Sequence, residues 1–431
     1  MKRDTFETGR EFARELDRSD PLAGFRTRFH LPPGTIYVDG NSLGPLSQNA
    51  EDSLRRVLDD WRTCGIGGWL DGNPPWFYLA ERLGERAAAL VGARPDEVVS
   101  TGTTTLNIHA LVGTLYRPEG RRTKILAGAL DFPTDIYALK SQIRLKGLDD
   151  GENLVLVPPG DGRFIDEGAA SDLMTDEVAL ALLPSVLYRS GQLLDIGRLT
   201  RSAHSRGVCI GFDCSHSVGA VPHTFDGDDV DFAVWCSYKY LNGGPGSPAF
   251  LFLSERHFTL EPALAGWFGC VKERQFDMAL GFEHAPSAGG WQISSPGILG
   301  AGAAAGALEL TLEAGIDRIR EKSLKMTSYL IFLVDSILSA QPYGFSIGTP
   351  RDPWRRGGHI ALERKEDAMR INEALKARGV VADFRPPDII RIAPIALYNT
   401  YEEIWRIVKN LREIIDNREY ENHSRERRII P

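Results

Sequence analysis

The stretch that decides the fold is WCSYKYLNGGPGSPAF, which runs from Trp235 to Phe250. The apolar run 232–236 has the length and composition of a strand that is buried on both faces. It leads directly into Tyr238 and Lys239, and the glycines in 243–246 predict a loop behind them. A lysine in this place is either a surface cation with a buried stem or a functional amine, and the buried strand before it favours the amine.

Composition sets the class of protein. A chain of 431 residues is long enough for two or three domains. Its 42% hydrophobic and 25% charged residues are ordinary for a globular protein. The net charge of −8 argues against nucleic acid as a partner, because a nucleic-acid-binding face is basic.

Neither a membrane span nor a metal site is expected. No apolar run approaches the roughly 18 residues that a spanning helix needs, and no apolar stretch follows Met1–Glu7, so we expect no signal peptide. The five cysteines show no CxxC spacing, and the nine histidines show no HExxH motif. We therefore expect a cytoplasmic protein with free thiols and without a metal.

Strand-like and helical patterns alternate through the middle of the chain, which is typical of βαβ units and a mostly parallel sheet. The expected strands are 97–100, 124–129, 154–157, 178–183, 208–212, 232–236 and 249–252. The expected helices between them are 106–115, 134–146, 166–175 and 196–206. This order predicts an α/β fold with a mostly parallel, seven-stranded sheet.

The ends of the chain have a different pattern. A long Ala-rich helix is expected at 298–314, and a weaker α+β pattern follows it. We predict an N-terminal arm and small-domain segment in 1–50, a large domain in 51–300 and a smaller α+β C-terminal domain in 301–431.

Polar clusters follow four of the expected strands, where ligands collect in a doubly wound sheet. They are 101–105, 131–135, 213–217 and 237–239. Each cluster also has a simpler explanation. Threonine before a helix is usually an N-cap, an aspartate is often a turn residue, a lone histidine is most often structural, and a lone phenylalanine is most often in the core.

Taken together, the four clusters fit pyridoxal phosphate. This cofactor needs an amine for a Schiff base, a carboxylate for its pyridinium nitrogen, donors for its phosphate and an apolar side chain against its ring. Lys239 supplies the amine, Asp213 the carboxylate, and Tyr238 and the threonine run the phosphate donors. The 26-residue spacing from Asp213 to Lys239 indicates a fold type I enzyme.

Six ordered segments give the chain a resemblance to the kynureninase family, which covers about 37–411. They are VDGNSLGP (38–45), FPTD (132–135), GFDCSHSVGAVP (211–222), WCSYKYLNGGPGS (235–247), GWFG (266–269) and IRIAPIALYNT (390–400). The resemblance implies the fold type I architecture of the class V aminotransferase group.

The resemblance also implies residue roles. Lys239 and Tyr238 are the catalytic residues, with Lys239 binding the cofactor and Tyr238 a candidate proton donor. The cofactor-binding residues are Thr104, Thr105, Phe132, Pro133, Thr134, Asp135, Asp213, His216, Tyr238, Lys239, Trp267 and Ser295. The substrate-binding residues are Arg391, Ser42 and Trp69, with Arg391 holding the α-carboxylate.

The activity implied by the resemblance is hydrolysis of L-kynurenine, or of its 3-hydroxy form, to anthranilate or 3-hydroxyanthranilate and L-alanine. It belongs to tryptophan catabolism and pyridine nucleotide biosynthesis. The resemblance also implies a homodimer with a shared active site, in which the neighbouring subunit supplies Trp267 and Ser295.

The sequence departs from the family pattern at several places. Cys270 follows GWFG where histidine is usual, Pro184 and Ser185 stand where relatives carry a phosphate contact, and Ser295 replaces a larger residue. Trp69 stands where animal members carry histidine, so we hypothesise a preference for unsubstituted kynurenine, with core packing as the alternative.

Two other functions stay open. One is a desulfurase- or selenocysteine-lyase-like enzyme that uses Cys270 as its nucleophile. The other is a cofactor-binding protein without catalysis.

Overall fold

The computed structural model describes residues 6–426. The expectation about a signal peptide concerns residues 1–7, most of which lie outside the described residues.

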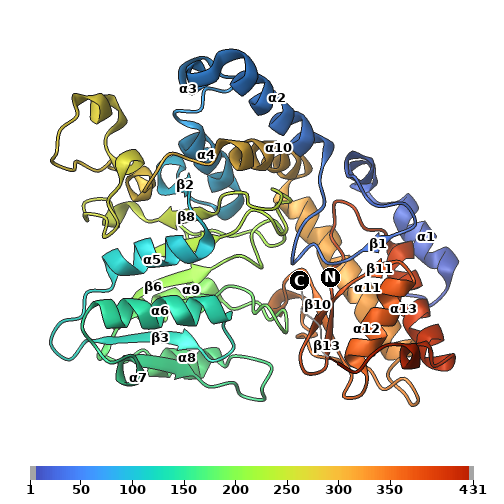
Figure 1. Ribbon diagram of the computed structural model, residues 1–431. Helices are drawn as coiled ribbons and strands as arrows, with labels where there is room; N and C mark the ends of the chain where they lie inside the picture. The colour runs from blue at the N-terminus through green and yellow to red at the C-terminus, as the bar shows by residue number, and fades with distance from the viewer. Residues whose placement is uncertain (1–5, 427–431) are drawn as a thin grey trace.

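A seven-stranded sheet forms the centre of the large domain, in the order β2-β8-β7-β6-β5-β3-β4 (Figure 1). β8 pairs antiparallel with both of its neighbours, and the other pairs in the sheet are parallel. The seven strands expected from the sequence are confirmed. Their bounds are β2 Val98–Ser100, β3 Lys124–Gly128, β4 Leu154–Val157, β5 Val178–Pro184, β6 Cys209–Asp213, β7 Phe232–Trp235 and β8 Phe250–Leu253.

Helices cover both faces of this sheet, which makes the domain doubly wound. Apolar side chains of α5 (Thr104–Leu115) and α6 (Pro133–Leu145) are buried against one face. Those of α4 (Leu79–Val91), α8 (Glu167–Leu173) and α9 (Ile196–His204) are buried against the other. Strand residues are buried on both sides because neighbouring side chains point to opposite faces. The remaining helices of this region are α2 Gln48–Cys64, α3 Gly68–Asp71 and α7 Asp150–Asn153.

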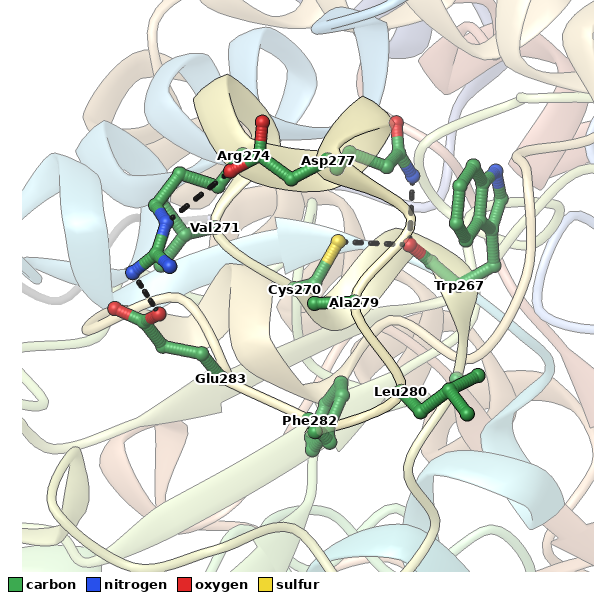
Figure 2. A pocket seen from close by; sticks show the side chains of 12 residues that line it. Trp267, Cys270, Val271, Arg274, Asp277, Ala279, Leu280, Phe282 and Glu283 are labelled. Atoms are coloured by element: carbon green, nitrogen blue, oxygen red, sulfur yellow. Dashed lines mark hydrogen bonds and ion pairs between the residues drawn. The ribbon is translucent and has the colours of Figure 1, made fainter.

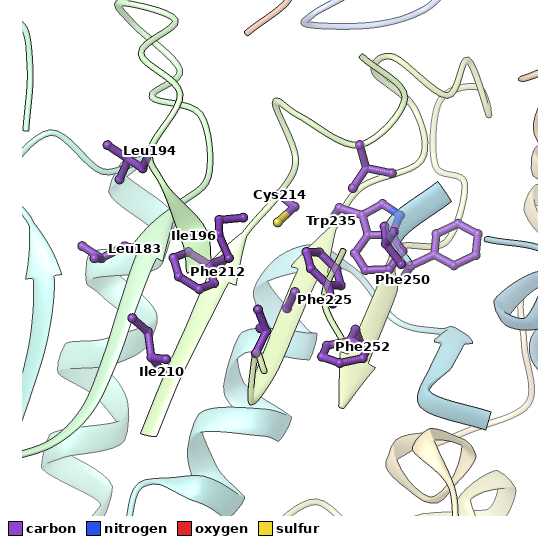
Figure 3. Close-up of a cluster of buried hydrophobic side chains, with 14 of the residues drawn as sticks. Leu183, Leu194, Ile196, Ile210, Phe212, Cys214, Phe225, Trp235, Phe250 and Phe252 are labelled. Atoms are coloured by element: carbon purple, nitrogen blue, oxygen red, sulfur yellow. The ribbon is translucent and has the colours of Figure 1, made fainter. Parts of the chain in front are cut away.

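The core beneath the expected site is densely aromatic (Figure 3). Trp235 and Phe250 stack on neighbouring strands, with ring centroids 5.5 Å apart, and Phe225 packs 5.0 Å from Phe252. Each buried aromatic side chain of this kind stabilises the fold by about 2–3 kcal/mol. This packing fixes the last residue of β7, Trp235, in the core. The loop that carries Tyr238 and Lys239 begins directly after it.

A second core forms the small domain. Its sheet has the order β12-β13-β10-β9 and is antiparallel. The bounds are β9 Ser346–Ile347, β10 Ile360–Glu363, β12 Asp383–Arg385 and β13 Ile389–Ile392. The sheet packs on α11 Ile316–Ile337, α12 Ala368–Ala377 and α13 Tyr401–Asp416.

The N-terminal segment belongs to this second core. β1 (Ile36–Tyr37) pairs in parallel with β11 (Val380–Val381), and α1 (Arg10–Arg18) packs beside α13. The chain therefore reaches the small domain first and leaves it through α2.

The Ala-rich helix α10 (Ile298–Ala314) has the bounds that the sequence predicts. Its Ala301, Ala305 and Leu308 pack with the core of the large domain, beside α2. We therefore propose that the domain boundary lies at Gly315, between α10 and α11, rather than at residue 300.

No helix in residues 6–426 is long and apolar enough to cross a membrane.

Candidate active site

The carboxyl ends of β2, β3, β6 and β7 meet at one edge of the sheet and surround a cavity of about 330 Å³. The four polar clusters expected to meet do so. The residues that line the cavity are Gly102, Thr103, Thr104, Thr105, Phe132, Thr134, Asp213, Ser215, His216, Cys236, Tyr238, Lys239, Gly246, Ser247 and Ala249. A smaller adjoining hollow adds Asp135 and Tyr188.

Lys239 points into this cavity and not into solvent. Its Nζ lies 2.9 Å from Nε2 of His216 and 5.9 Å from the centre of the Phe132 ring. Burial lowers the pKa of His216 well below its ordinary value, and the nearby charge of Lys239 lowers it further. His216 is therefore a neutral imidazole that accepts a hydrogen bond from Lys239.

The loop that carries Lys239 is held by the N-terminal segment of the chain. The backbone N–H of Gly44 donates to the carbonyl of Tyr238 at 2.7 Å. A Cβ atom at Gly44 would lie 2.6 Å from the carbonyl oxygen of Lys239, so only glycine permits this approach. The motif NSLG thus joins the small-domain side of the molecule to the lysine loop.

Two buried carboxyl groups, Asp213 and Asp135, lie together at the end of β6. Burial raises the pKa of Asp135 well above its ordinary value, and the charge of Asp213 raises it further. Oδ1 of Asp135 is buried and has no hydrogen-bond partner among the described residues. A buried acid pair with a free oxygen suits a protonated ring nitrogen, because that cation would offset the carboxylate charge.

The opposite end of the cavity suits a phosphate. Thr103 caps α5, since its side chain accepts a hydrogen bond from the backbone of Leu106 at 3.3 Å. Thr104 and Thr105 begin the helix, and the Thr105 hydroxyl lies 2.9 Å from that of Thr134. Hydroxyls and free N–H groups at a helix N-terminus bind anions well. Phe132 is 42% exposed beside the cavity, so the core alternative for this residue is wrong. These residues fit pyridoxal phosphate.

Arg391 lies on β13 with only 1% of its surface exposed. Its Nη1 donates to the carbonyl of Tyr188 at 2.6 Å, its Nη2 to the hydroxyl of Ser42 at 3.1 Å and its Nε to Asp383 at 2.7 Å. The Tyr188 ring packs edge-on to Phe132, with centroids 5.2 Å apart. Arg391 and Ser42 are therefore next to the cavity, as expected for the two substrate contacts.

Three of the expected site residues lie elsewhere in the same chain. Trp267 lines a different cavity of about 230 Å³ together with Cys270, Arg274 and Phe282 (Figure 2). Ser295 is exposed and does not line the Lys239 cavity. Trp69, on α3, packs 5.9 Å from Trp76 and 5.7 Å from Phe268, measured between ring centroids. None of the three lines the Lys239 cavity of its own chain.

Sequence reasoning missed three neighbours of the site: Tyr188, Asp383 and His359. His359 is fully buried, and its ring centroid lies 5.8 Å from that of the His216 ring. The signals available were SVLYRSG after β5 and the alternating DFR before β13, but neither resembles a chemical motif on its own.

Comparison with protein families shows two matches. Residues 319–411 match the model of the kynureninase C-terminal domain, and residues 78–352 match that of class V aminotransferases. A kynureninase of Geobacillus thermodenitrificans is 52% identical over 430 residues, covering 100% of both chains. The chain belongs to the kynureninase family.

Solved structures with low sequence identity share the fold. The apo cysteine desulfurase of Thermococcus onnurineus superposes with a TM-score of 0.75 at 17% identity, over 94% of this chain and 98% of that one. A mutant of the lyase C-DES, with glycine covalently linked to its pyridoxal phosphate, gives 0.77 at 16% identity, over 90% and 99%. The class V aminotransferase-like fold type I architecture is confirmed.

Pyridoxal 5′-phosphate is the cofactor of this kynureninase-family chain. Lys239 is the lysine that lies in the cavity, and it has a neutral histidine against its amine. The individual roles of the cofactor- and substrate-binding residues remain predictions.

Proposed function

We propose that this chain hydrolyses L-kynurenine to anthranilate and L-alanine, with activity on 3-hydroxy-L-kynurenine as well. The observation that carries the proposal is the cavity in which Lys239, Asp213 and the Thr104–Thr105 helix start converge within reach of Arg391. The full-length identity of 52% to a kynureninase supports the same reaction.

When bound, pyridoxal phosphate supplies imine formation with the substrate amine and an electron sink for the carbanions formed next to it. Lys239 holds the cofactor and then moves the substrate α-proton with its amine. Neutral His216 keeps that amine oriented through the 2.9 Å contact. Water adds to the side-chain ketone, and the Cβ–Cγ bond breaks to release anthranilate and, after protonation, alanine.

Tyr238 is our candidate for the last proton donor. Burial raises the pKa of its phenol above the ordinary value, so the side chain carries its proton at neutral pH. A general acid works best when its pKa lies near the operating pH, so this role requires the pKa of Tyr238 to be lower in the loaded site, a change that the charge of Lys239 would favour and a nearby phosphate would oppose. Arg391 and Ser42 hold the α-carboxylate meanwhile.

Fluorescence of released anthranilate tests the proposal directly. Purified, cofactor-loaded protein is mixed with L-kynurenine, and anthranilate and L-alanine are both quantified. Equal amounts of the two products are expected. A protein that carries its cofactor on Lys239 but releases neither product would refute the proposed reaction and favour the catalytically silent alternative.

The desulfurase alternative has weaker support. Cys270 lies in the separate Trp267 cavity, where its thiol donates to the Trp267 carbonyl at 3.1 Å. Cys236 lines the Lys239 cavity, but burial raises the pKa of its thiol and disfavours the thiolate that sulfur chemistry needs. Sulfide release from L-cysteine that is lost in Cys270→Ala would revive this alternative.

We also propose a homodimer with shared active sites. Trp267 and Ser295 lie outside their own chain's cavity, and large apolar side chains are exposed in two segments of the large domain, 61–70 and 276–280. The exposed side chains are Trp61, Ile66, Leu70, Phe276, Met278 and Leu280. An interface with a second copy would remove these apolar side chains from water.

Subunit complementation tests this dimer. If Lys239 and Trp267 act in one site from different chains, Lys239→Ala and Trp267→Ala proteins should each be impaired, but a mixed dimer should contain one intact site. Refolding the two variants together is expected to restore about a quarter of wild-type activity, from random pairing of two-fold dimers. Recovery no higher than the sum of the separate variants would contradict a shared site.

Trp69 carries the prediction on specificity. Trp69→His is expected to raise kcat/KM for 3-hydroxy-L-kynurenine relative to L-kynurenine by roughly tenfold, because a hydrogen-bonding ring would replace an apolar one near the substrate. The ratio of the two values cancels any general loss of folded protein. Comparable kcat/KM for the two substrates in the wild-type enzyme would contradict the hypothesis.

We further propose a cytoplasmic location and a place in tryptophan catabolism or pyridine nucleotide biosynthesis. All five cysteines are free, including the exposed Cys64, which suits a reducing compartment. Anthranilate and alanine are the products that such a route would pass on.

A further inference from the structure

The guanidinium of Arg391 has two edges, each of which can bind a carboxylate with two parallel hydrogen bonds. In the structure one edge contacts a carboxylate and the other does not. Nε and Nη2 form the inner edge, and both donate to Oδ2 of Asp383, Nε at 2.7 Å. The outer edge is formed by Nη1 and Nη2, which contact the Tyr188 carbonyl and the Ser42 hydroxyl. An arginine carries five N–H donors, and one N–H on Nη1 has no acceptor among the described residues.

Asp383 is placed by the sheet to hold this inner edge. Asp383 and Arg391 are directly opposite each other on the antiparallel strands β12 and β13, so their side chains lie on one face. Both side chains are almost completely buried, at 3% and 1% exposed. The Asp383 carboxylate offsets the charge of the buried arginine and fixes the plane of its guanidinium.

The charged groups around Arg391 are a second arginine and two acids. Oδ2 of Asp383 also accepts from Nε of Arg385 at 3.0 Å, so one carboxylate lies between two guanidinium groups. Asp39 is the other acid nearby, and burial together with the charge of Asp383 raises its pKa to about 6. At neutral pH Asp39 is therefore mostly ionised, and the two acids together balance the two arginines. The feature of Arg391 that is open to a further acceptor is the free N–H of Nη1 at its outer edge, which lies beside Tyr188 and the cavity.

We propose that Asp383 is the positioning residue for substrate: it holds Arg391 by the inner edge so that the outer edge, with Ser42, receives the α-carboxylate of the amino-acid substrate. This inference rests on the proposed function, because it assumes a substrate with an α-carboxylate. It predicts that loss of Asp383 weakens binding of the α-carboxylate, and that it does so only by changing the orientation of Arg391.

Asp383→Asn tests the inference, since asparagine keeps the size and one oxygen but removes the charge. For L-kynurenine, KM is expected to rise roughly tenfold or more while kcat changes by less than about threefold, because the lost interaction orients a ground-state contact. A second readout needs no turnover: L-alanine, a carboxylated product, is titrated against the cofactor absorbance, and its dissociation constant should rise by a similar factor. Kynuramine, which is kynurenine without the carboxyl group, should inhibit both proteins equally.

Asp20→Asn is the matched control. Asp20 forms an equally buried ion pair with Lys322, at 2.6 Å with 3% and 5% exposed side chains, away from Arg391. The Asp20→Asn substitution should lower the melting temperature of the protein without changing the KM for L-kynurenine. If Asp383→Asn does not fold, Asp383→Glu, which keeps the charge and shifts it, is expected to show the same rise in KM to a smaller extent.

The outcomes separate this inference from the proposed function. Wild-type protein that releases no anthranilate would overturn the function itself. Wild-type turnover with an unchanged KM and alanine affinity in Asp383→Asn, or an equal loss of kynuramine binding, would overturn the role of Asp383 alone.

Discussion

Lys239→Ala is expected to abolish turnover of L-kynurenine, with kcat reduced by roughly a thousandfold or more. The amine is the group that both holds the cofactor and carries the α-proton, and no other lysine lines the cavity among residues 6–426. The variant should also lose the visible absorbance of lysine-bound cofactor. Spectra of the purified protein and the anthranilate assay measure the two effects.

Two further proteins make this result specific. Lys140→Ala removes a lysine from the exposed surface of α6, where its side chain is 42% exposed, and should leave kcat and the spectrum unchanged. Methylamine added to Lys239→Ala should restore part of the activity if the missing group is the amine itself. Lys239→Ala with a normal spectrum would mean that another residue binds the cofactor.

Arg391→Ala is expected to lower kcat/KM by roughly 10²- to 10³-fold, mainly through KM, because a buried, hydrogen-bonded charge contact of this kind is worth about 2–5 kcal/mol. Arg391→Lys should recover only part of the loss, since an ammonium cannot make the two parallel contacts of a guanidinium. Steady-state kinetics with L-kynurenine measures both. An unchanged KM in Arg391→Ala would show that the carboxylate binds elsewhere.

The control for Arg391→Ala must separate substrate binding from the loss of a buried arginine. Arg356 is equally buried, at 1% exposed, and it donates to Ser328 and to the carbonyl of Arg351 in the small domain. Arg356→Ala should reduce thermal stability but leave KM near the wild-type value. Equal rises in KM for both variants would attribute the effect to the small-domain fold.

Much of the fold could be predicted because its signals are local. Each strand is a short apolar run, such as 232–236 for β7. α5 begins where a threonine run follows a strand. Short windows of sequence are therefore enough to predict these elements. α10 has the predicted bounds for the same reason, since its Ala-rich helical pattern ends directly before Gly315. The domain boundary was harder to predict because it depends on which core α10 packs against, and a helix that is apolar all round does not indicate its partner.

The chemistry of the site divides in the same way. Lys239, Asp213 and the threonines were found because each follows a strand, and the carboxyl ends of parallel strands meet at one edge. Asp383 and Tyr188 were missed because their importance comes from contacts with Arg391 and Phe132 that form only in the folded chain. Ser42 likewise reaches Arg391 across 349 residues of sequence.

The sequence by itself determined the seven strands, the lysine that follows β7 and the family, since these depend on residues that are neighbours in the chain or on ordered motifs. Only the tertiary structure decided which edge of Arg391 is held by Asp383, that His216 is a neutral partner of Lys239, and that Trp267 lies outside its own chain's cavity. The physical reason is that burial and pairing set the charge and orientation of these groups, and both arise only when distant segments pack together.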